Sequence, residues 1–134
     1  MRTAALLLAP LALAASLATG SAGAAPPASD RALARIGETV RVHGVRVTPL
    51  RVIEDSRCPQ NARCVWAGRV RISARIAGVV RELTLGEPFA VRGGGVQLSA
   101  VVPERTTLQG TIPPRAYRFG FEFRRDVGMQ LIRK

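Results

Sequence analysis

The sequence contains little of what catalytic and metal sites are built from. His43 is the only histidine, and Cys58 and Cys64 are the only cysteines. A transition-metal site needs several such ligands, so pairing of the two cysteines excludes one. A nucleophile–base pair needs a reactive hydroxyl or thiol beside a histidine. We therefore predict no enzyme activity, no metal and no cofactor, and we expect His43 to be a structural or surface residue.

Aromatic residues and lysine are also scarce. The chain has four Phe, one Tyr and one Trp, and Lys134 is the only lysine among 20 basic residues. Platforms for single-stranded nucleic acid need aromatic side chains among the cations, so no nucleic-acid partner is expected. The net charge of +11 favours anionic glycans, lipid head groups or acidic proteins as partners. A genome of high GC content explains dispersed arginines equally well.

The N-terminus is typical of a secretory signal peptide. Arg2 precedes an apolar run over residues 4–17, and a segment of small residues then ends at Ala24. A basic start, an apolar core of about 7–15 residues and a small-residue cleavage site define such peptides. We predict that residues 1–24 are removed, with cleavage after Ala25 as the alternative. The protein is then secreted or periplasmic.

Two alternatives to export are disfavoured by the same segment. A membrane-spanning helix needs about 20 apolar residues, and this run stops at Gly, Ser and Pro before that length. No cysteine lies near the cleavage site, so the protein is not expected to be a lipoprotein. Residues 25–36 are predicted to be a flexible lead-in, because prolines and small residues there offer little to pack. Within them, only residues 29–36 could form a helix, and a short one.

Apolar residues in the rest of the chain recur with period two, in short runs separated by Gly and Pro. This pattern is typical of half-buried strands. In the clearest run, Val70, Ile72, Ala74 and Ile76 alternate with Arg69, Arg71, Ser73 and Arg75. Strands are predicted over residues 39–43, 45–53, 69–76, 79–85, 89–91, 96–102, 117–123 and 129–133.

About seven to eight short strands with frequent turns predict an all-β fold, an antiparallel β-sandwich or partly open barrel over residues 37–134. Pro49 predicts an edge position or a bulge in its strand, and Ala77-Gly78 a hairpin turn. Phe119, Phe121 and Phe123 share one face of their strand. Together with Trp66 they are expected to form the bulky part of the core.

One segment, residues 54–68, interrupts the alternation and holds both cysteines. In an oxidising compartment, an isolated pair this close forms a disulfide. On the chain-entropy model, a disulfide that closes the seven-residue loop Cys58–Cys64 stabilises the folded state by about 2.4 kcal/mol. Pro59 restricts the backbone further, and Trp66 is expected to fold back over the bridge. The sequence therefore predicts one short, rigid disulfide loop.

The same residues resemble a known signature. Glu-Asp-Ser-Arg-Cys-Pro, four residues, Cys, one residue and Trp-Ala-Gly, over residues 54–68, is similar to the motif of a family of small exported bacterial proteins. Many of these are lipoproteins, and their function is uncharacterised. Elsewhere the likeness is limited to the strand pattern and to residues 101–103. The resemblance implies a small exported β protein and brings no activity. This chain lacks the lipoprotein cysteine.

The disulfide loop is the first candidate contact surface, with Glu54, Asp55, Arg57, Arg63 and Trp66 as its residues. Glu54 and Asp55 could form a carboxylate pair, but neighbours in an extended chain point to opposite faces. We expect turn hydrogen bonds and a salt bridge to Arg57 or Arg63 instead. A loop of this kind could also present Arg63, or Arg57, to a trypsin-like protease, because a rigid loop lowers the entropic cost of binding.

A row of arginines, Arg69, Arg71 and Arg75, on one strand face is the second candidate. It would bind anionic glycans or lipid head groups. The sequence thus predicts an exported, non-enzymatic binding or structural envelope protein. Its partner is an unidentified envelope protein or anionic surface component, and a protease inhibitor or a binder of anions is the alternative.

Overall fold

The computed structural model describes Gly23, residues 29–108 and residues 110–125, which are almost entirely strand and turn. The strands are β1 (Arg31–Ala34), β2 (Val40–Val42), β3 (Val45–Asp55), β4 (Val70–Ile76), β5 (Val79–Thr84), β6 (Pro88–Val91), β7 (Gly94–Val102) and β8 (Arg118–Arg124), with one short 3-10 helix at Pro114–Ala116. The predicted signal peptide, apart from Gly23, and the predicted strand 129–133 lie outside the described residues.

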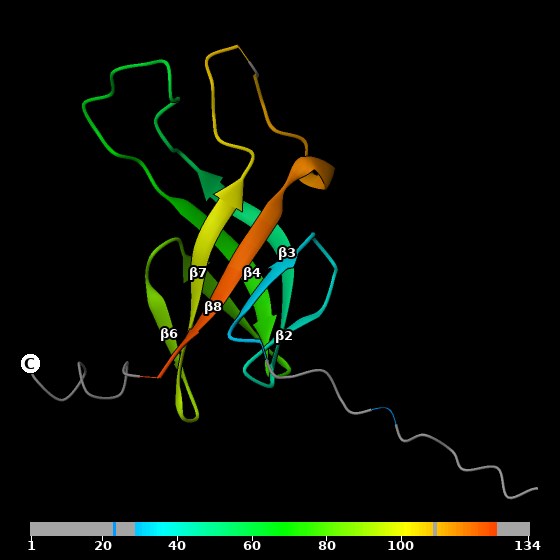
Figure 1. The fold of residues 1–134 in the computed structure, drawn as a ribbon. Helices are drawn as coiled ribbons and strands as arrows, with labels where there is room; N and C mark the ends of the chain where they lie inside the picture. Colours follow the sequence, from blue (N-terminus) through cyan, green and yellow to red (C-terminus); the bar gives the residue numbers. More distant parts are fainter. Residues whose placement is uncertain (1–22, 24–28, 109, 126–134) are drawn as a thin grey trace, which may run out of the picture.

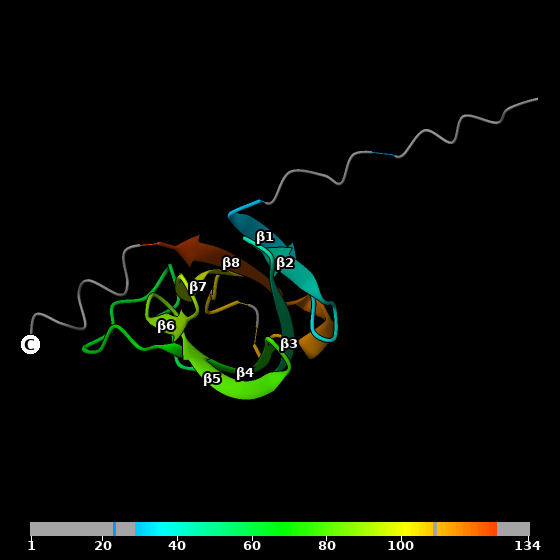
Figure 2. The same cartoon turned by 90° about the horizontal axis from the view of Figure 1, so that it is seen from below.

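The strands form two four-stranded antiparallel sheets (Figure 1). One has the order β1-β8-β7-β6 and the other the order β2-β3-β4-β5. Seen along the strands, the two sheets curve around a common interior (Figure 2). The predicted all-β sandwich is confirmed.

Alternation along β4 gives this strand one apolar buried face and one face that carries its arginines. In β4, Val70, Ile72, Ala74 and Ile76 are buried, whereas Arg75 is exposed. The buried residues of both sheets form one cluster, and Phe119, Phe121 and Phe123 of β8 are part of it, as predicted. Burial of this apolar surface is the main favourable term that holds the sheets together.

Tight turns set the register of the hairpins. His43 and Gly44 join β2 to β3, and Ala77 and Gly78 join β4 to β5; all four residues have positive φ. Positive φ at both central positions is the mark of the type I′ turn, whose twist matches that of paired strands. The hairpin predicted at Ala77-Gly78 is confirmed, with Ile76 opposite Val79.

Two irregularities change which residues face outward. In β3 the pairing with β4 shifts after Pro49 and again after Val52, so the bulge predicted at Pro49 is present. In β7 the pairing with β8 shifts between Leu98 and Ala100. Bulges of this kind bend a strand and redirect its side chains.

Two sequence-based expectations are wrong. Residues 25–36 were predicted to be a flexible lead-in, with a possible helix at 29–36. Residues 25–28 lie outside the described part of the chain, but Arg31–Ala34 forms β1 and pairs with β8, with Ala32 opposite Phe121. Pairing satisfies the backbone of this segment at the edge of the sheet. Trp66 was expected in the core, but 81% of its surface is exposed.

Candidate functional site

Two loops project from the same end of the sandwich, opposite the described N- and C-terminal residues (Figure 1). We call this the loop end. The first loop, residues 56–69, joins β3 to β4 and contains the predicted Cys58–Cys64 disulfide, which is formed. The second, residues 103–117, joins β7 to β8. The loops therefore bring together two segments that are about 45 residues apart in the chain.

A largely buried ion pair lies at the base of the first loop. Arg57 donates hydrogen bonds of 2.8 Å from Nε and Nη2 to Oδ1 and Oδ2 of Asp55. Tyr117, at the end of the second loop, donates its hydroxyl proton to Asp55 Oδ2 at 2.9 Å. Charge-assisted, two-pronged pairs of this type are among the strongest polar contacts in proteins. The three side chains fix the two loops to the sandwich.

The arginines also tie one loop to the backbone of the other. Arg57 donates to the carbonyl oxygens of Val101 and Pro103, at 2.8 and 3.0 Å. In the other direction, Arg105 of the second loop donates hydrogen bonds of 3.1 Å to the carbonyl oxygens of Asp55 and Arg57. Such contacts satisfy loop carbonyls that would otherwise lose hydrogen bonds on burial.

Further out, the two loops are paired directly. The backbone N–H of Gln60 donates to the Arg105 carbonyl at 2.8 Å. The Asn61 side chain accepts from the Thr107 N–H at 2.9 Å and donates to the Thr107 hydroxyl. The disulfide and these bonds hold the loops as one unit, which we call the clasp. Its residues are Asp55, Arg57, Gln60, Asn61, Arg105, Thr107 and Tyr117.

The clasp changes how its groups titrate. Burial raises the pKa of Asp55, but the hydrogen bonds from Arg57 and Tyr117 outweigh burial and leave that pKa below its usual value. The hydrogen bond to Asp55 raises the pKa of Arg57. Burial, followed by the hydrogen bond to Asp55, raises the pKa of Tyr117 to about 12. The network therefore holds a carboxylate, a guanidinium and a neutral phenol, which is its most strongly bonded state.

The first residues of the motif close the base of the loop on its outer side. Ser56 donates its hydroxyl proton to Glu54 at 2.9 Å, and the Ser56 N–H donates to the Arg69 carbonyl at 2.9 Å. That hydroxyl hydrogen bond, followed by the one from Arg69, lowers the pKa of Glu54. Gly68 has φ +69°, and a Cβ there would overlap the Ser56 carbonyl oxygen. Only glycine fits at this position.

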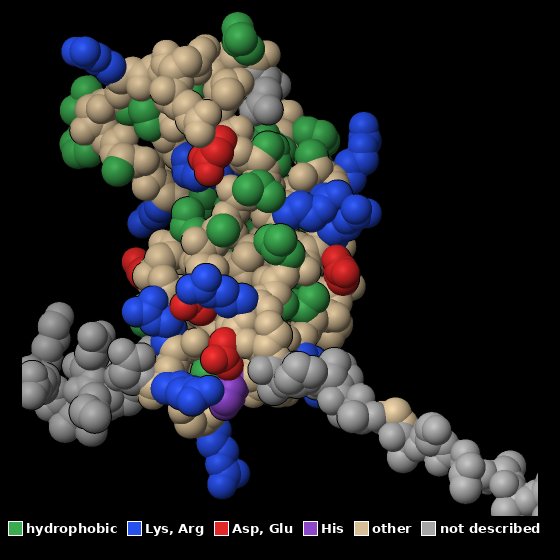
Figure 3. Space-filling view, viewed as in Figure 1, with side chains coloured by type: hydrophobic (Ala, Val, Ile, Leu, Met, Phe, Trp, Pro, Cys, Tyr) green, Lys and Arg blue, Asp and Glu red, His purple; other side chains and the backbone are tan. Residues whose placement is uncertain are grey.

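The tips of the loops, in contrast, carry exposed apolar side chains. Val65 and Trp66 on the first loop are 90% and 81% exposed, and Leu108 on the second is 90% exposed. Figure 3 shows hydrophobic side chains over the loops at this end of the molecule. Val65 and Trp66 are neighbours in the chain, and exposed apolar patches mark interaction surfaces. These three residues are the candidate contact site.

The predicted interaction loop is therefore divided between two roles. Glu54, Asp55 and Arg57 are engaged in the contacts that hold the loop, and the salt bridge expected between Asp55 and Arg57 is confirmed. Arg63 and Trp66 are exposed on the surface of the loop. Only these last two side chains are placed to meet a partner.

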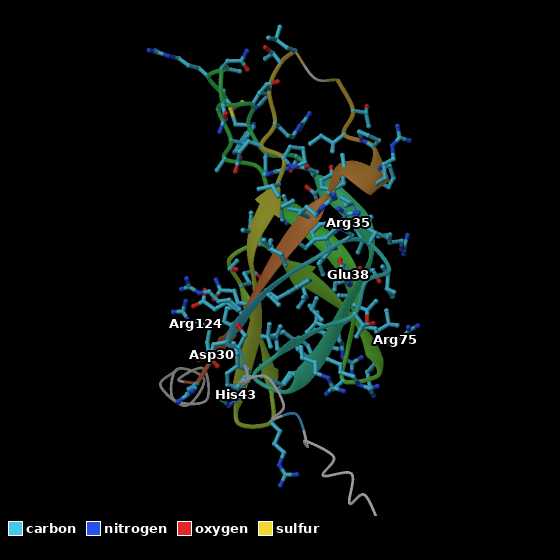
Figure 4. All side chains as sticks on the ribbon, turned by 45° about the vertical axis from the view of Figure 1, so that its right-hand side comes forward. Asp30, Arg35, Glu38, His43, Arg75 and Arg124 are labelled. Carbon is cyan, nitrogen blue, oxygen red and sulfur yellow. A yellow bond between two sulfur atoms is a disulfide. The ribbon has the colours of Figure 1, made fainter. Side chains whose placement is uncertain are left out.

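The predicted cationic row is interrupted by carboxylates. Arg69 and Arg71 both bind Glu54 Oε2, at 3.0 and 3.1 Å, and Arg71 also binds Glu82 at 3.3 Å. Pairing with carboxylates cancels much of the positive field of these two residues. Arg75 is exposed and projects from the sheet (Figure 4). The structure thus leaves Arg75 as the member of the row that can attract an anion.

His43 lies at the other end of the molecule from the clasp, close to Asp30 (Figure 4). Its Nδ1 is 2.8 Å from Asp30 Oδ1, and its ring stacks on Phe123 with centroids 4.3 Å apart. Asp30 Oδ2 also forms an ion pair with Arg125 Nη2, at 3.5 Å. These contacts attach the residues before β1 to the β2–β3 turn and to the end of β8.

A hollow of about 560 Å³ lies on the outer face of β1, β7 and β8. Its charged residues, Arg31 and Glu122, pair with each other at 3.3 Å. Its hydroxyl, on Ser99, donates to the Gly120 carbonyl at 3.2 Å. Because its polar groups bond to one another, the hollow offers few free groups to orient a ligand.

Sequence reasoning missed Tyr117, Arg105 and Leu108 as parts of the site. Arg105 and Leu108 lie between two predicted strands, and Tyr117 was predicted only as the first residue of the strand 117–123. The sequence does show that Tyr117 is the only tyrosine and that Leu108 lies among polar residues, and a tyrosine hydroxyl needs a partner once it is buried. Their meeting with the first loop depends on the β7–β8 connection, which no local pattern reveals.

No protein-family model, curated protein or solved structure matches this chain. In the described part of the chain, no helix is long and apolar enough to cross a bilayer. Among those residues there is also no group of three or more His, Cys, Asp or Glu placed to hold a metal ion.

Proposed function

We propose that this protein is an exported, non-enzymatic binding module that docks onto another envelope protein through the loop end. The observation that carries the proposal is the exposure of Val65, Trp66 and Leu108 on loops that the clasp holds together. Tryptophan is among the residues that most often dominate binding energy when a partner buries them. If the two loops were flexible, much of that binding energy would be spent on the conformational entropy lost when they become ordered in the complex.

The charge distribution favours an apolar contact over binding of a polyanion at this end. Between residues 58 and 67 the only charged residue is Arg63, and residues 106–113 contain none. The loop tips are thus almost uncharged in a chain of net charge +11. Interface centres are depleted of charge and enriched in aromatic residues and Arg. A partner with an apolar cleft, rimmed by an acceptor for Arg63, fits this surface.

Export supports the choice of an envelope partner. The signal-like N-terminus predicts passage across a membrane. A formed disulfide is compatible with an oxidising compartment. The similarity of residues 54–68 to small exported bacterial proteins points in the same direction. We assign no reaction to the protein, because the described side-chain contacts of His43, the only histidine, are with Asp30 and the ring of Phe123 and include no nucleophile.

The test is site-specific photo-crosslinking in the native envelope. A benzophenone amino acid at position 66 should give one main protein adduct, and the same group at the exposed Arg92, far along the chain, should not. Adding Val65→Ser and Leu108→Ser should abolish the adduct. With the partner purified, Trp66→Ala should weaken binding by about 2 kcal/mol or more. Equal adducts from both positions, or unchanged affinity, would contradict the proposal.

The intrinsic fluorescence gives an independent measurement. Trp66 is the only tryptophan in the chain, so its emission reports the loop end alone. Binding of the partner should shift this emission to shorter wavelength and protect it from soluble quenchers, because the indole leaves water. A partner that binds without changing the emission would occupy another surface.

Arg63 favours a second candidate function, inhibition of trypsin-like proteases. It is exposed inside the disulfide-closed ring and makes no ion pair with a described carboxylate. Incubation with trypsin should then slow the enzyme at a fixed stoichiometry, and Arg63→Ala should remove this effect. Cleavage of the loop with no slowing would rule out inhibition and leave the docking proposal untouched.

A further inference from the structure

A small polar hollow of about 190 Å³ lies on the outer face of the sheet β2-β3-β4-β5, away from the loop end. It is lined by Thr39, Arg46, Thr48, Arg75 and Gly78. Its two cations come from neighbouring strands, and its two hydroxyls come from β3 and from the residue before β2. The hollow therefore combines the groups that proteins use to bind small oxyanions.

The strand register brings the two guanidinium groups to one place. Thr48 of β3 lies directly opposite Arg75 of β4, and Arg46 is two residues before Thr48 on the same face. Arg46 and Arg75 are thus diagonal neighbours, with a spacing of about 7–8 Å in an antiparallel pair. Two long side chains from such positions can close on one ligand above Thr48. The Arg46 carbonyl also accepts from the Ala77 N–H at 3.0 Å, which holds the β4–β5 turn beside the hollow.

The two threonines leave a donor available at the bottom of the hollow. Thr48 is nine-tenths buried, with 9% of its surface exposed. Its hydroxyl is 2.7 Å from that of Thr39. One hydroxyl donates the proton in this bond, so the other keeps its own proton for a further acceptor. A ligand oxygen between Arg46 and Arg75 would supply that acceptor.

The surrounding charges favour an anion here. No described carboxylate forms an ion pair with Arg46 or Arg75. Glu54 and Glu82 on this face are bound by Arg69 and Arg71. The carboxylate of Glu38, which precedes Thr39 in the chain, is engaged as well: it accepts a hydrogen bond from the Arg35 N–H at 2.9 Å.

Repulsion between two arginines on the same face also favours a bound anion. Arg41 lies directly opposite Arg46, and like charges in opposed positions destabilise a sheet. A bound anion would relieve that repulsion.

We propose that this hollow binds one phosphate-sized oxyanion, either free phosphate or the phosphate ester of a lipid head group. Arg46 and Arg75 donate charge-assisted hydrogen bonds to its oxygens, and the threonine pair donates one from below. The small volume admits a single anionic group rather than an extended chain of them. This site is separate from the docking surface proposed above, and it requires no partner protein.

The test is calorimetric titration of the full folded protein with inorganic phosphate. Saturable binding is expected, and Arg46→Ser and Arg75→Ser should each weaken it by about tenfold or more, since each removes a hydrogen bond to a charged group. Thr48→Val, which keeps the shape but removes the hydroxyl, should weaken it less. The matched control is Arg92→Ser, which removes the same charge from an exposed turn. Circular dichroism of each variant checks that the fold is kept.

Absence of saturable binding, or equal weakening by Arg92→Ser and Arg75→Ser, would overturn the proposal, because net charge alone would then explain the attraction. Sedimentation with phosphatidylglycerol vesicles separates the two sources of phosphate. Retention that depends on Arg75 and is competed by inorganic phosphate assigns the site to a lipid head group. Phosphate binding without such retention assigns it to free phosphate.

Discussion

Arg57 binds both carboxylate oxygens of Asp55, only two residues before it, at 2.8 Å each. The pair is local in sequence, yet the same guanidinium reaches the carbonyl of Val101, near the end of β7, and that of Pro103, the first residue of the second loop. The side chains are 12% and 8% exposed, so the charges are largely removed from water. A single arginine therefore connects the start of the disulfide loop to the start of the second loop.

Removing that arginine should leave a buried carboxylate without its counter-charge. Arg57→Met keeps most of the side-chain volume and is expected to lower the free energy of unfolding by about 3 kcal/mol. Arg63→Met, which removes the same charge from an exposed position on the same loop, should change it by less than about 0.5 kcal/mol. Urea denaturation followed by circular dichroism measures both. Similar values for the two variants would show that the pair is not a main support of the fold.

The phenol of Tyr117 should lose its proton only at unusually high pH. Its pKa is raised to about 12 from 10.0, first by burial and then by the hydrogen bond to Asp55. Tyr117 is the only tyrosine, so absorbance of tyrosinate near 295 nm follows it alone. The folded protein should show a midpoint near pH 12, and the urea-unfolded chain one near pH 10.

The sign of the linked stability change follows from that shift. Because the folded-state pKa is raised, the stabilisation is fully present below pH 10.0 and is lost as the pH rises toward about 12. Tyr117→Phe should remove this alkaline loss, and Asp55→Asn should move the midpoint of Tyr117 downward. A midpoint near 10 in the folded protein would mean that the phenol does not reach Asp55.

Strand periodicity predicted most of this fold because a pleated strand, once one face is buried, imposes its period of two on the sequence. β4 shows this clearly: its four apolar positions are buried and its arginines face outward. The strand at Arg31–Ala34 was not predicted from this periodicity. Its four residues are too few to show a period, and its strand state comes from pairing with β8, about 90 residues later in the chain.

The site was predictable only where its contacts are local. Glu54 and Asp55 do point to opposite faces, one opposite Arg71 and the other opposite Val70. That Glu54 then neutralises Arg69 and Arg71 could not be inferred, because the register depends on two shifts within β3. Trp66 was misplaced for a different reason. Large apolar residues are usually buried, and nothing in the sequence around Trp66 marks it as an exposed one.

Gly68 offers a direct test of the base of the loop. It has φ +69°, and a Cβ there would overlap the Ser56 carbonyl, whereas Gly86 has φ +85° with nothing within 4 Å of a Cβ. Both positions strain an L-residue by about 1–2 kcal/mol. Gly68→Ala must also displace Ser56 and weaken its 2.9 Å bond to the Arg69 carbonyl.

We therefore expect Gly68→Ala to cost about 2 kcal/mol more than Gly86→Ala, the usual penalty of forcing extra atoms into a packed site. Urea denaturation of the two variants measures the difference. Because the backbone at Ser56 continues into the disulfide loop, Gly68→Ala should also alter the fluorescence anisotropy of Trp66, and Gly86→Ala should not. Equal costs and equal anisotropies would mean that the close approach at Ser56 relaxes freely, and that the display of Trp66 does not depend on it.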